Sequence, residues 1–197
     1  MTRPDMALPA GLVLLTGGKG ERLGGPKHDR PHPAGGSWGG HLVEVFRAVF
    51  PEGPVCVLGQ ALPDHPELKP YPDPGEGPAV ALRLWAARED VPAAARWWIV
   101  PCDQVRWTAE DLAAWHAQAV GADPEATRWV MAEQDGHAQP LGGFLGHGLR
   151  PSLAAVHAST VRRLAEGVGS LTVPQDCAAW QDVDDPGDLR AWVAPPG

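Results

Sequence analysis

A short apolar run that ends in a glycine-rich, basic loop is the feature that most restricts how this chain can fold. Residues 11–16 are typical of a buried strand, and residues 17–27 contain five glycines together with Lys19, Arg22 and Lys27. Because glycine has no Cβ, such a loop can bring its backbone N–H groups against a ligand. A strand followed by a glycine-rich basic loop therefore predicts a nucleotide-phosphate site in an α/β protein.

The loop does not match the commonest phosphate-binding motifs. In Gly-x-Gly-x-x-Gly the third glycine would fall on Leu23, and Gly-x-x-x-x-Gly-Lys from Gly20 reaches Gly25 but then meets Pro26. A glycine-rich turn can also serve only to reverse the chain, with its basic residues solvated. From the residues alone, a phosphate site and a plain turn both stay open.

Length and charge limit the classes of protein that fit. With 197 residues, 44% of them hydrophobic, we expect a single domain over residues 1–197, with frayed ends at 1–10 and 194–197. The net charge of −8 disfavours a nucleic-acid partner, because binding to phosphate backbones needs clustered basic residues. We see no signal peptide and no apolar stretch of membrane-spanning length, so we expect a cytoplasmic protein without a membrane partner.

The sulfur and aromatic residues are expected to be structural. The odd number of cysteines, Cys56, Cys102 and Cys177, and their wide spacing disfavour disulfides and predict core thiols in a reducing compartment. Nine tryptophans are scattered singly, and we expect them to pack in the core.

Strand and helix patterns alternate along the chain, which is typical of a parallel sheet covered by helices. Strands are predicted at 11–16, 54–58, 96–100, 128–132, 138–145, 171–174 and 179–183. Helices are predicted at 41–50, at 77–88, from Thr108 to near Gly121, within 149–166 and at 186–193. Several late strands follow each other too closely for helical crossovers. We therefore expect a mixed, mainly parallel sheet in a Rossmann-like three-layer α/β/α sandwich, with a ligand crevice at the carboxyl ends of its strands.

Acidic residues at several places could serve such a crevice. Asp103 follows the most hydrophobic strand, and one or two carboxylates with a triphosphate form a typical Mg²⁺ site, although Asp103 could equally cap a turn. Asp182, Asp184 and Asp185 form a second cluster, in which one aspartate before Pro186 is an ordinary helix N-cap.

A proline- and glycine-rich segment offers a possible base contact. Asp73 could accept hydrogen bonds from the N1–H and N2–H₂ groups of guanine, or it could form an Asx turn.

Five segments resemble one enzyme family. Leu-Thr-Gly-Gly-Lys-Gly-Glu-Arg-Leu-Gly-Gly-Pro-Lys at 15–27 resembles the Leu-Ala-Gly-Gly-x-x-x-Arg-Met-Gly-x-x-Lys signature of nucleotidyltransferases that activate sugars and cofactors, especially the molybdenum cofactor guanylyltransferases. The strand that ends in Pro-Cys-Asp at 101–103 is similar to the family's metal-binding element. Residues 73–78 resemble its base and ribose loop, and Gln-Pro-Leu at 139–141 corresponds to a short element facing the acceptor. Residues 181–189 resemble its C-terminal Asn-Val-Asn-Thr-Pro-Glu-Asp-Leu segment.

The resemblance implies a nucleotide-diphospho-sugar transferase type of fold and transfer of GMP from GTP to the phosphate of molybdopterin, with release of pyrophosphate. It implies Mg²⁺ or Mn²⁺ as the cofactor, GTP and the molybdenum cofactor as partners, and cofactor-insertion and molybdoenzyme-maturation proteins as further partners. The catalytic residues it implies are Lys19, Arg22, Lys27 and Asp103, the last as the metal ligand. The nucleotide-binding residues it implies are Leu15, Thr16, Gly17, Gly18, Lys27, Asp73, Gly77 and Asp103. The acceptor-side residues it implies are Gln139, Pro140, Asp182 and Asp184.

The chain also departs from the family pattern. Thr16 replaces the usual alanine, Asp182 and Asp184 stand where asparagines are usual, and residues 28–40 form a longer segment rich in proline and glycine. Three alternatives stay open: a related nucleotidyltransferase that uses CTP or another nucleotide and acceptor, a non-catalytic nucleotide-binding module, and a dinucleotide-binding dehydrogenase. The last is disfavoured because the loop does not match the Gly-x-Gly-x-x-Gly fingerprint of dinucleotide-binding proteins.

Overall fold

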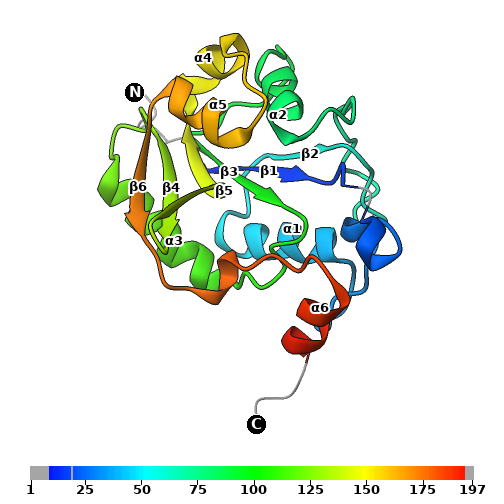
Figure 1. Ribbon diagram of the computed structural model, residues 1–197. Helices are drawn as coiled ribbons and strands as arrows, with labels where there is room; N and C mark the ends of the chain where they lie inside the picture. The colour runs from blue at the N-terminus through cyan, green and yellow to red at the C-terminus, as the bar shows by residue number, and fades with distance from the viewer. Residues whose placement is uncertain (1–8, 19, 194–197) are drawn as a thin grey trace, which may run out of the picture.

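A six-stranded sheet, in the order β2-β1-β3-β5-β4-β6, forms the middle layer of the computed structural model, which describes residues 9–18 and 20–193 (Figure 1). Its strands are β1 (Gly11–Leu15), β2 (Val55–Leu58), β3 (Arg96–Pro101), β4 (Trp129–Gln134), β5 (His137–Gly146) and β6 (Ser170–Pro174). Strand β1 runs parallel to β2 and β3, and β4 runs parallel to β6. Only β5 is antiparallel to its two neighbours, β3 and β4. The predicted mixed, mainly parallel sheet is confirmed.

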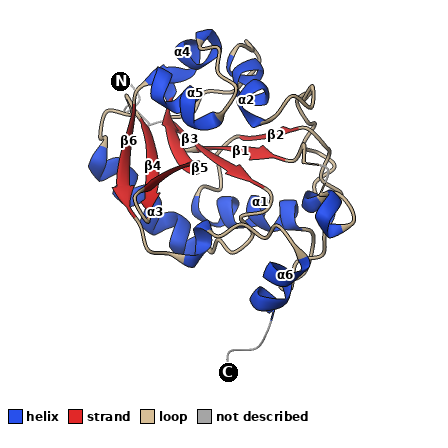
Figure 2. Ribbon diagram, viewed as in Figure 1, coloured by secondary structure: helices blue, strands red, loops and turns tan. Residues whose placement is uncertain are grey.

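Helices cover both faces of this sheet, as predicted for a three-layer sandwich (Figure 2). One face carries α1 (Trp38–Val49) and α3 (Ala109–Ala122), and the other carries α2 (Pro78–Ala86), α4 (Arg150–Ala155) and α5 (Val161–Val168). A last helix, α6 (Pro186–Val193), lies beside the start of α1, where the rings of Trp192 and Trp38 are 6.1 Å apart. Short 3₁₀ turns are η1 (Glu21–Leu23), η2 (Lys27–Asp29), η3 (His147–Leu149) and η4 (Ala178–Trp180).

Alternation along the central strands divides the core between the two faces. In β1, Leu12 and Leu14 pack toward α1 and α3, whereas Val13 and Leu15 pack toward α2 and α5. Neighbouring side chains point to opposite faces of a strand, so a strand buried on both faces must be apolar throughout. This burial explains why the strand patterns were so clear in the sequence.

Helix α1 begins at Trp38, three residues before the start predicted at His41. The hydroxyl of Ser37 accepts the N–H of Gly40 at 3.0 Å and caps the helix. The prediction missed this start because Gly39 and Gly40 are poor helix formers. Here a Cβ at Gly39 would lie 2.5 Å from Leu62 Cδ2, so the glycine admits the loop that packs against the helix.

The strand predicted at 179–183 is wrong. This segment contains the 3₁₀ turn η4 and then an extended loop. Its buried residues, Ala179, Trp180 and Val183, imitate a strand pattern, but the ring of Trp180 packs edge-on against the rings of Trp107 and Trp115. The apolar pattern at 179–183 therefore comes from individual buried side chains and not from a strand.

The predicted fraying can be compared with the structure only at residues 9 and 10, because residues 1–8 and 194–197 lie outside the description. Residues 9 and 10 are not frayed. Ala10 is buried, and the carbonyl of Pro9 accepts the N–H of Ala95 at 2.9 Å. The three cysteines are free thiols, and Cys56 and Cys102 are buried as predicted, whereas Cys177 is only partly buried. Across the described residues, no helix combines the length and apolar character needed to cross a bilayer.

Candidate functional site

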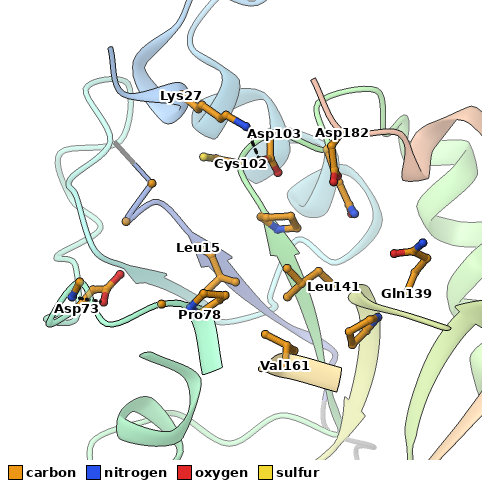
Figure 3. A pocket seen from close by; sticks show the side chains of 17 residues that line it. Leu15, Lys27, Asp73, Pro78, Cys102, Asp103, Gln139, Leu141, Val161 and Asp182 are labelled. Carbon is orange, nitrogen blue, oxygen red and sulfur yellow. Dashed lines mark hydrogen bonds and ion pairs between the residues drawn. The ribbon is translucent and has the colours of Figure 1, made fainter. Parts of the chain in front are cut away.

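A pocket of about 450 Å³ opens where β1 and β3 end (Figure 3). It lies at the carboxyl edge of the parallel strands, where ligands of α/β proteins usually bind. Six segments supply its walls: the glycine loop after β1, the loop before α2, the turn after β3, residues 139–141 of β5, the start of α5 and the segment that contains Asp182. The predicted residues that line it are Leu15, Gly17, Gly18, Lys27, Asp73, Gly77, Asp103, Gln139, Pro140 and Asp182.

Lys27 and Asp103, predicted from distant parts of the sequence, meet at the head of this pocket. Lys27 Nζ lies 2.8 Å from Asp103 Oδ2 and 2.5 Å from Asp184 Oδ1. Burial opposes the charge of the lysine, but hydrogen bonds to both carboxylates outweigh it and raise the pKa of Lys27. The ammonium group is therefore charged throughout the neutral range.

Backbone and apolar contacts hold these charges in place. The N–H of Val183 donates to the carbonyl of Asp103 at 3.0 Å, so the C-terminal segment is fixed beside the turn after β3. A small apolar cluster contains Leu23 of the glycine loop, Trp38, Val105 and Val183, with Leu189 and Trp192 packed against it. This cluster joins three segments that carry site residues.

Asp182 presents its carboxyl group to the same pocket. Desolvation, together with the nearby Asp103 carboxylate, raises the pKa of Asp182 to about 6, while a hydrogen bond from Gln104 works in the opposite direction. The residue also keeps an exposed surface, so solvent screens part of this effect. Near neutral pH Asp182 is therefore ionised, but its charge beside Asp103 costs free energy.

We expect Asp182→Asn to change the pH dependence of stability. A carboxyl group whose pKa is raised binds its proton more tightly in the folded than in the unfolded protein, so its contribution to stability falls as pH rises from about 4 to about 6. The variant should therefore gain stability relative to wild type at pH 7.5 compared with pH 4. Urea unfolding at both pH values measures this. A variant whose stability relative to wild type is the same at both pH values, like the exposed control Glu52→Gln, would contradict the prediction.

Gln139 and Pro140, which were predicted to face the acceptor, lie at a bulge in β5. The register between β4 and β5 shifts between Val130 and Ala132, so residues 140–143 have no regular partners on β4. Gly142 has a φ of +86°, and its carbonyl accepts the indole N–H groups of Trp98 at 2.9 Å and Trp115 at 3.0 Å. Bulges often direct side chains at active sites. This one brings residues 139–141 to the pocket.

At the opposite end of the pocket, Asp73 connects the loop before α2 with the glycine loop after β1. Its Oδ1 accepts the N–H of Gly75 at 2.8 Å, which is the Asx turn considered from the sequence. Its Oδ2 lies against Gly17, where a Cβ would collide with it. Gly17 therefore allows the loop before α2 to touch the glycine loop. Figure 3 shows Asp73 at the far side of the pocket from Gln139.

Thr16 lies beside the pocket, but its side chain points elsewhere. The residue is fully buried. Its hydroxyl oxygen accepts the N–H of Gln60 at 2.7 Å, and its one proton faces the carbonyls of Leu58 and Gln60, each at 2.9 Å. This hydroxyl ties the end of β1 to the segment after β2. The departure from the usual alanine therefore has a structural reason.

Thr16→Val is expected to lower the free energy of unfolding by about 2 kcal/mol, because it leaves the N–H of Gln60 without its acceptor in a partly buried place. Urea unfolding measures the loss, and Thr16→Ser, which keeps the hydroxyl, should restore most of it. Equal stability of the valine and serine variants would contradict this reading.

Arg22, another predicted cation, does not line the main pocket. Arg22 lines a second hollow of about 290 Å³ together with Gly20, Glu21, Lys27 and Asp184. Lys27 borders both cavities, so Arg22 and Asp184 lie on the far side of it from the main pocket. Lys19 falls outside the described residues.

Several pocket residues were missed from the sequence. Gln104 is buried in the pocket wall, and Val161 reaches the pocket from the start of α5. The position of Gln104 directly after Asp103 was an available signal, whereas nothing in the sequence pointed to Val161. Cys102 also lines the pocket, but burial raises the pKa of this thiol to about 12, so it stays protonated and is a poor nucleophile.

A family model described as a MobA-like NTP transferase domain matches residues 12–173, which span the sheet and most of the pocket. The chain belongs to this family. As a member of the MobA-like NTP transferases, the protein is a nucleotidyltransferase, and the resemblance of the glycine loop to that superfamily is confirmed.

Known relatives of this MobA-like protein agree in sequence and in fold. A probable molybdenum cofactor guanylyltransferase of Rhodopirellula baltica is 29% identical over 94% of this chain and 93% of its own length. The structure of molybdopterin-guanine dinucleotide biosynthesis protein A from Archaeoglobus fulgidus has a TM-score of 0.67 at 12% identity, covering 92% of this chain and 95% of that one. Rv0371c from Mycobacterium tuberculosis, solved in complex with manganese, has a TM-score of 0.61 at 19% identity, covering 94% and 97% of the two chains. The predicted Rossmann-like α/β fold is confirmed.

Proposed function

We propose that this nucleotidyltransferase transfers GMP from GTP to the phosphate of molybdopterin and releases pyrophosphate. The observation that carries the proposal is the convergence of the glycine loop, Lys27 and Asp103 on one pocket. The Rhodopirellula baltica relative, a probable molybdenum cofactor guanylyltransferase that aligns with nearly the full length of this chain, supports the choice of nucleotide and acceptor.

The two ends of the pocket suit different parts of the reaction. The loop containing Asp73 and Gly77 would hold the base and ribose, while Leu15 and the amides of Gly17 and Gly18 would contact the nucleotide between that loop and Lys27. Gln139, Pro140 and Asp182 would face the acceptor at the opposite end. The α-phosphorus would then lie between them, near Lys27.

Such a reaction asks little of protein bases, because the attacking phosphate of the acceptor is already ionised near neutral pH. It would attack the α-phosphorus in line with the leaving pyrophosphate. Lys27 would stabilise the charge that develops, and Arg22 in the adjoining hollow would meet the outer phosphates, with Lys19 of the same loop as a further cation. Catalysis is then positioning combined with electrostatic stabilisation.

The carboxylates near Lys27 fit a divalent cation. Asp103 would be its main ligand and Asp182 or Asp184 a second, and all of them offer the hard oxygen donors that Mg²⁺ or Mn²⁺ prefers. Within the described residues, no three acidic, histidine or cysteine side chains form a ready-made ligand set. One or two carboxylates suffice where substrate phosphates and water complete the coordination. When bound, the cation would neutralise phosphate charge during the transfer.

Pyrophosphate release tests the proposal. Purified protein is mixed with Mg²⁺, molybdopterin and either GTP, CTP or ATP, with reactions lacking acceptor as blanks. Release that depends on the acceptor and is fastest with GTP is expected. Release that is fastest with CTP or ATP would identify a related nucleotidyltransferase instead, and the absence of release with every nucleotide would remove the catalytic proposal.

A further inference from the structure

Outside the pocket, the imidazole rings of His32 and His41 stack face to face. Their centroids are 3.7 Å apart, and their planes differ by 8°. His32 belongs to residues 28–40, the proline- and glycine-rich segment that departs from the family pattern, and His41 lies in the first turn of α1. Neither residue lines the main pocket, and the proposed reaction uses neither side chain.

Both rings bond the backbone of the turn that follows β3. The Nε2 atom of His32 lies 3.3 Å from the carbonyl oxygen of Val105, and that of His41 lies 3.0 Å from the carbonyl oxygen of Trp107. A carbonyl oxygen only accepts hydrogen bonds, so each Nε2 carries a proton and is the donor. Asp103 stands two residues before Val105 in the same turn. The stacked pair therefore holds the segment that carries this carboxylate.

The partners of His32 also fix its charge. Its Nδ1 atom lies 3.1 Å from the backbone nitrogen of Ala34 and accepts that N–H, so Nδ1 carries no proton and the imidazole is neutral. Burial and the neighbouring His41 lower the pKa of His32 to about 4. Burial also lowers the pKa of His41, although its hydrogen bond to Trp107 acts in the opposite direction. Both rings are therefore neutral near pH 7, and in this state they can stack without the repulsion of two positive charges.

A helix from the C-terminal segment completes the surroundings of His32. The ring of Trp192 in α6 lies 5.1 Å from that of His32, at a tilt of 56°. Charged residues of the elements packed here have other partners: Arg106 of the turn donates to Gln181 Oε1, Glu44 of α1 pairs with His65, Asp188 of α6 accepts the N–H of Asp184, and Arg30 lies over the ring of Trp38. Among the described residues, His41 is thus the titratable group that faces His32.

We propose that His32 and His41 are positioning residues for the nucleotidyl transfer: their stacked, neutral rings fix the turn after β3 and so set where Asp103 presents its carboxylate. The inference rests on the proposed role of Asp103 in the reaction. The C-terminal segment holds the same turn, because the N–H of Val183 donates to the carbonyl of Asp103 at 3.0 Å. Loss of the histidine contacts would let the carboxylate move away from Lys27, now 2.8 Å from it, and a small displacement of a catalytic group slows a reaction strongly.

Steady-state kinetics of pyrophosphate release test this inference, with whichever nucleotide wild type uses fastest. His32→Phe keeps a ring against His41 but removes both hydrogen bonds, and we expect kcat to fall about tenfold while the KM for nucleotide changes by less than about threefold. His32→Gln has an amide N–H that can reach the Val105 carbonyl, so it should restore kcat to within about threefold of wild type. The matched control is His116→Phe, which replaces a half-buried histidine on α3 whose ring packs against Phe50 at 4.8 Å. This control should keep the wild-type kcat.

Amide hydrogen exchange of the substrate-free protein follows the turn separately from catalysis. The N–H of Val183 is bonded to the carbonyl of Asp103, so its protection reports whether the turn is in place. We expect this N–H to exchange about tenfold faster in His32→Phe than in wild type, and at close to the wild-type rate in His32→Gln and His116→Phe. Thermal unfolding shows that each variant is folded at the temperature of the assay.

Several outcomes would overturn the inference. An unchanged kcat in His32→Phe excludes the positioning role, and so does an equal loss in His32→Gln or in His116→Phe. A change confined to KM, with Val183 exchanging as in wild type, would show that the pair does not position Asp103. Fastest release with CTP rejects guanylyl transfer but leaves the comparison of the variants valid. If wild type releases no pyrophosphate with any nucleotide, the proposed function and the catalytic role of the pair both fall, whereas exchange of Val183 still shows whether the pair holds the turn.

Discussion

Asp103→Asn is expected to reduce pyrophosphate release by about 10²- to 10³-fold, equivalent to about 3 to 4 kcal/mol in the transition state. The substitution keeps the shape of the side chain but removes the charge that pairs with Lys27 at 2.8 Å and that would hold a divalent cation. Because the carbonyl of Asp103, not its side chain, accepts the N–H of Val183, the neighbouring segment should stay in place.

The loss should appear chiefly in kcat, with thermal unfolding close to that of wild type. Glu52→Gln serves as the matched control, because it removes one carboxylate from an exposed turn far from the pocket. Activity within about threefold of wild type would show that Asp103 is dispensable, and the pocket would then favour the non-catalytic nucleotide-binding alternative.

Gly142→Ala is expected to lower the free energy of unfolding by about 4 kcal/mol. At a φ of +86°, any Cβ strains the backbone, which costs of the order of 1–3 kcal/mol. The same Cβ would collide with the buried indole of Trp180 and lie 2.8 Å from Gln104 Oε1, and overpacking of this kind costs about 1–3 kcal/mol more. The ring of Trp180 is buried between the rings of Trp107 and Trp115 and has little room to move.

Urea unfolding measures this loss, and Gly148→Ala is the matched control, since a Cβ there meets nothing within 4 Å. Any folded Gly142→Ala protein should also show a raised KM for the acceptor with a smaller change in the KM for nucleotide. A cost below about 1 kcal/mol would show that the bulge adapts freely and does not fix the acceptor end of the pocket.

Most of the fold followed from local patterns in the sequence. Strands β1 and β3 are buried on both faces, so their apolar runs were unmistakable, and Thr108 marked the start of α3 because its hydroxyl caps the N–H of Asp111. Predictions failed where tertiary contacts override local preference. Examples are the glycines at the start of α1, which admit a neighbouring loop, and the turn at Trp180, whose burial imitates a strand.

Only some contacts of the pocket could be predicted from the sequence. The meeting of Lys27 and Asp103 could be foreseen, because both follow strands whose carboxyl ends share one edge of the sheet. The direction of the Thr16 side chain could not, since it depends on where the segment after β2 passes. Likewise, the pairing of Asp184 with Lys27 depends on a contact across 157 positions that no local pattern specifies.

The segment that follows the sheet and ends in α6 affects where the functional part of the chain should be taken to end. The family match ends at residue 173, yet Asp182 and Asp184 come later in the chain, as do Val183, Leu189 and Trp192 of the apolar cluster around Leu23. A protein shortened at that boundary would retain five strands whole and all of β6 except Pro174, but it would lose part of the cover over Leu23 and Trp38. Surveys of sequence variation that stop with the sheet would therefore overlook the tail, although this tail carries one of the two carboxylates bonded to Lys27.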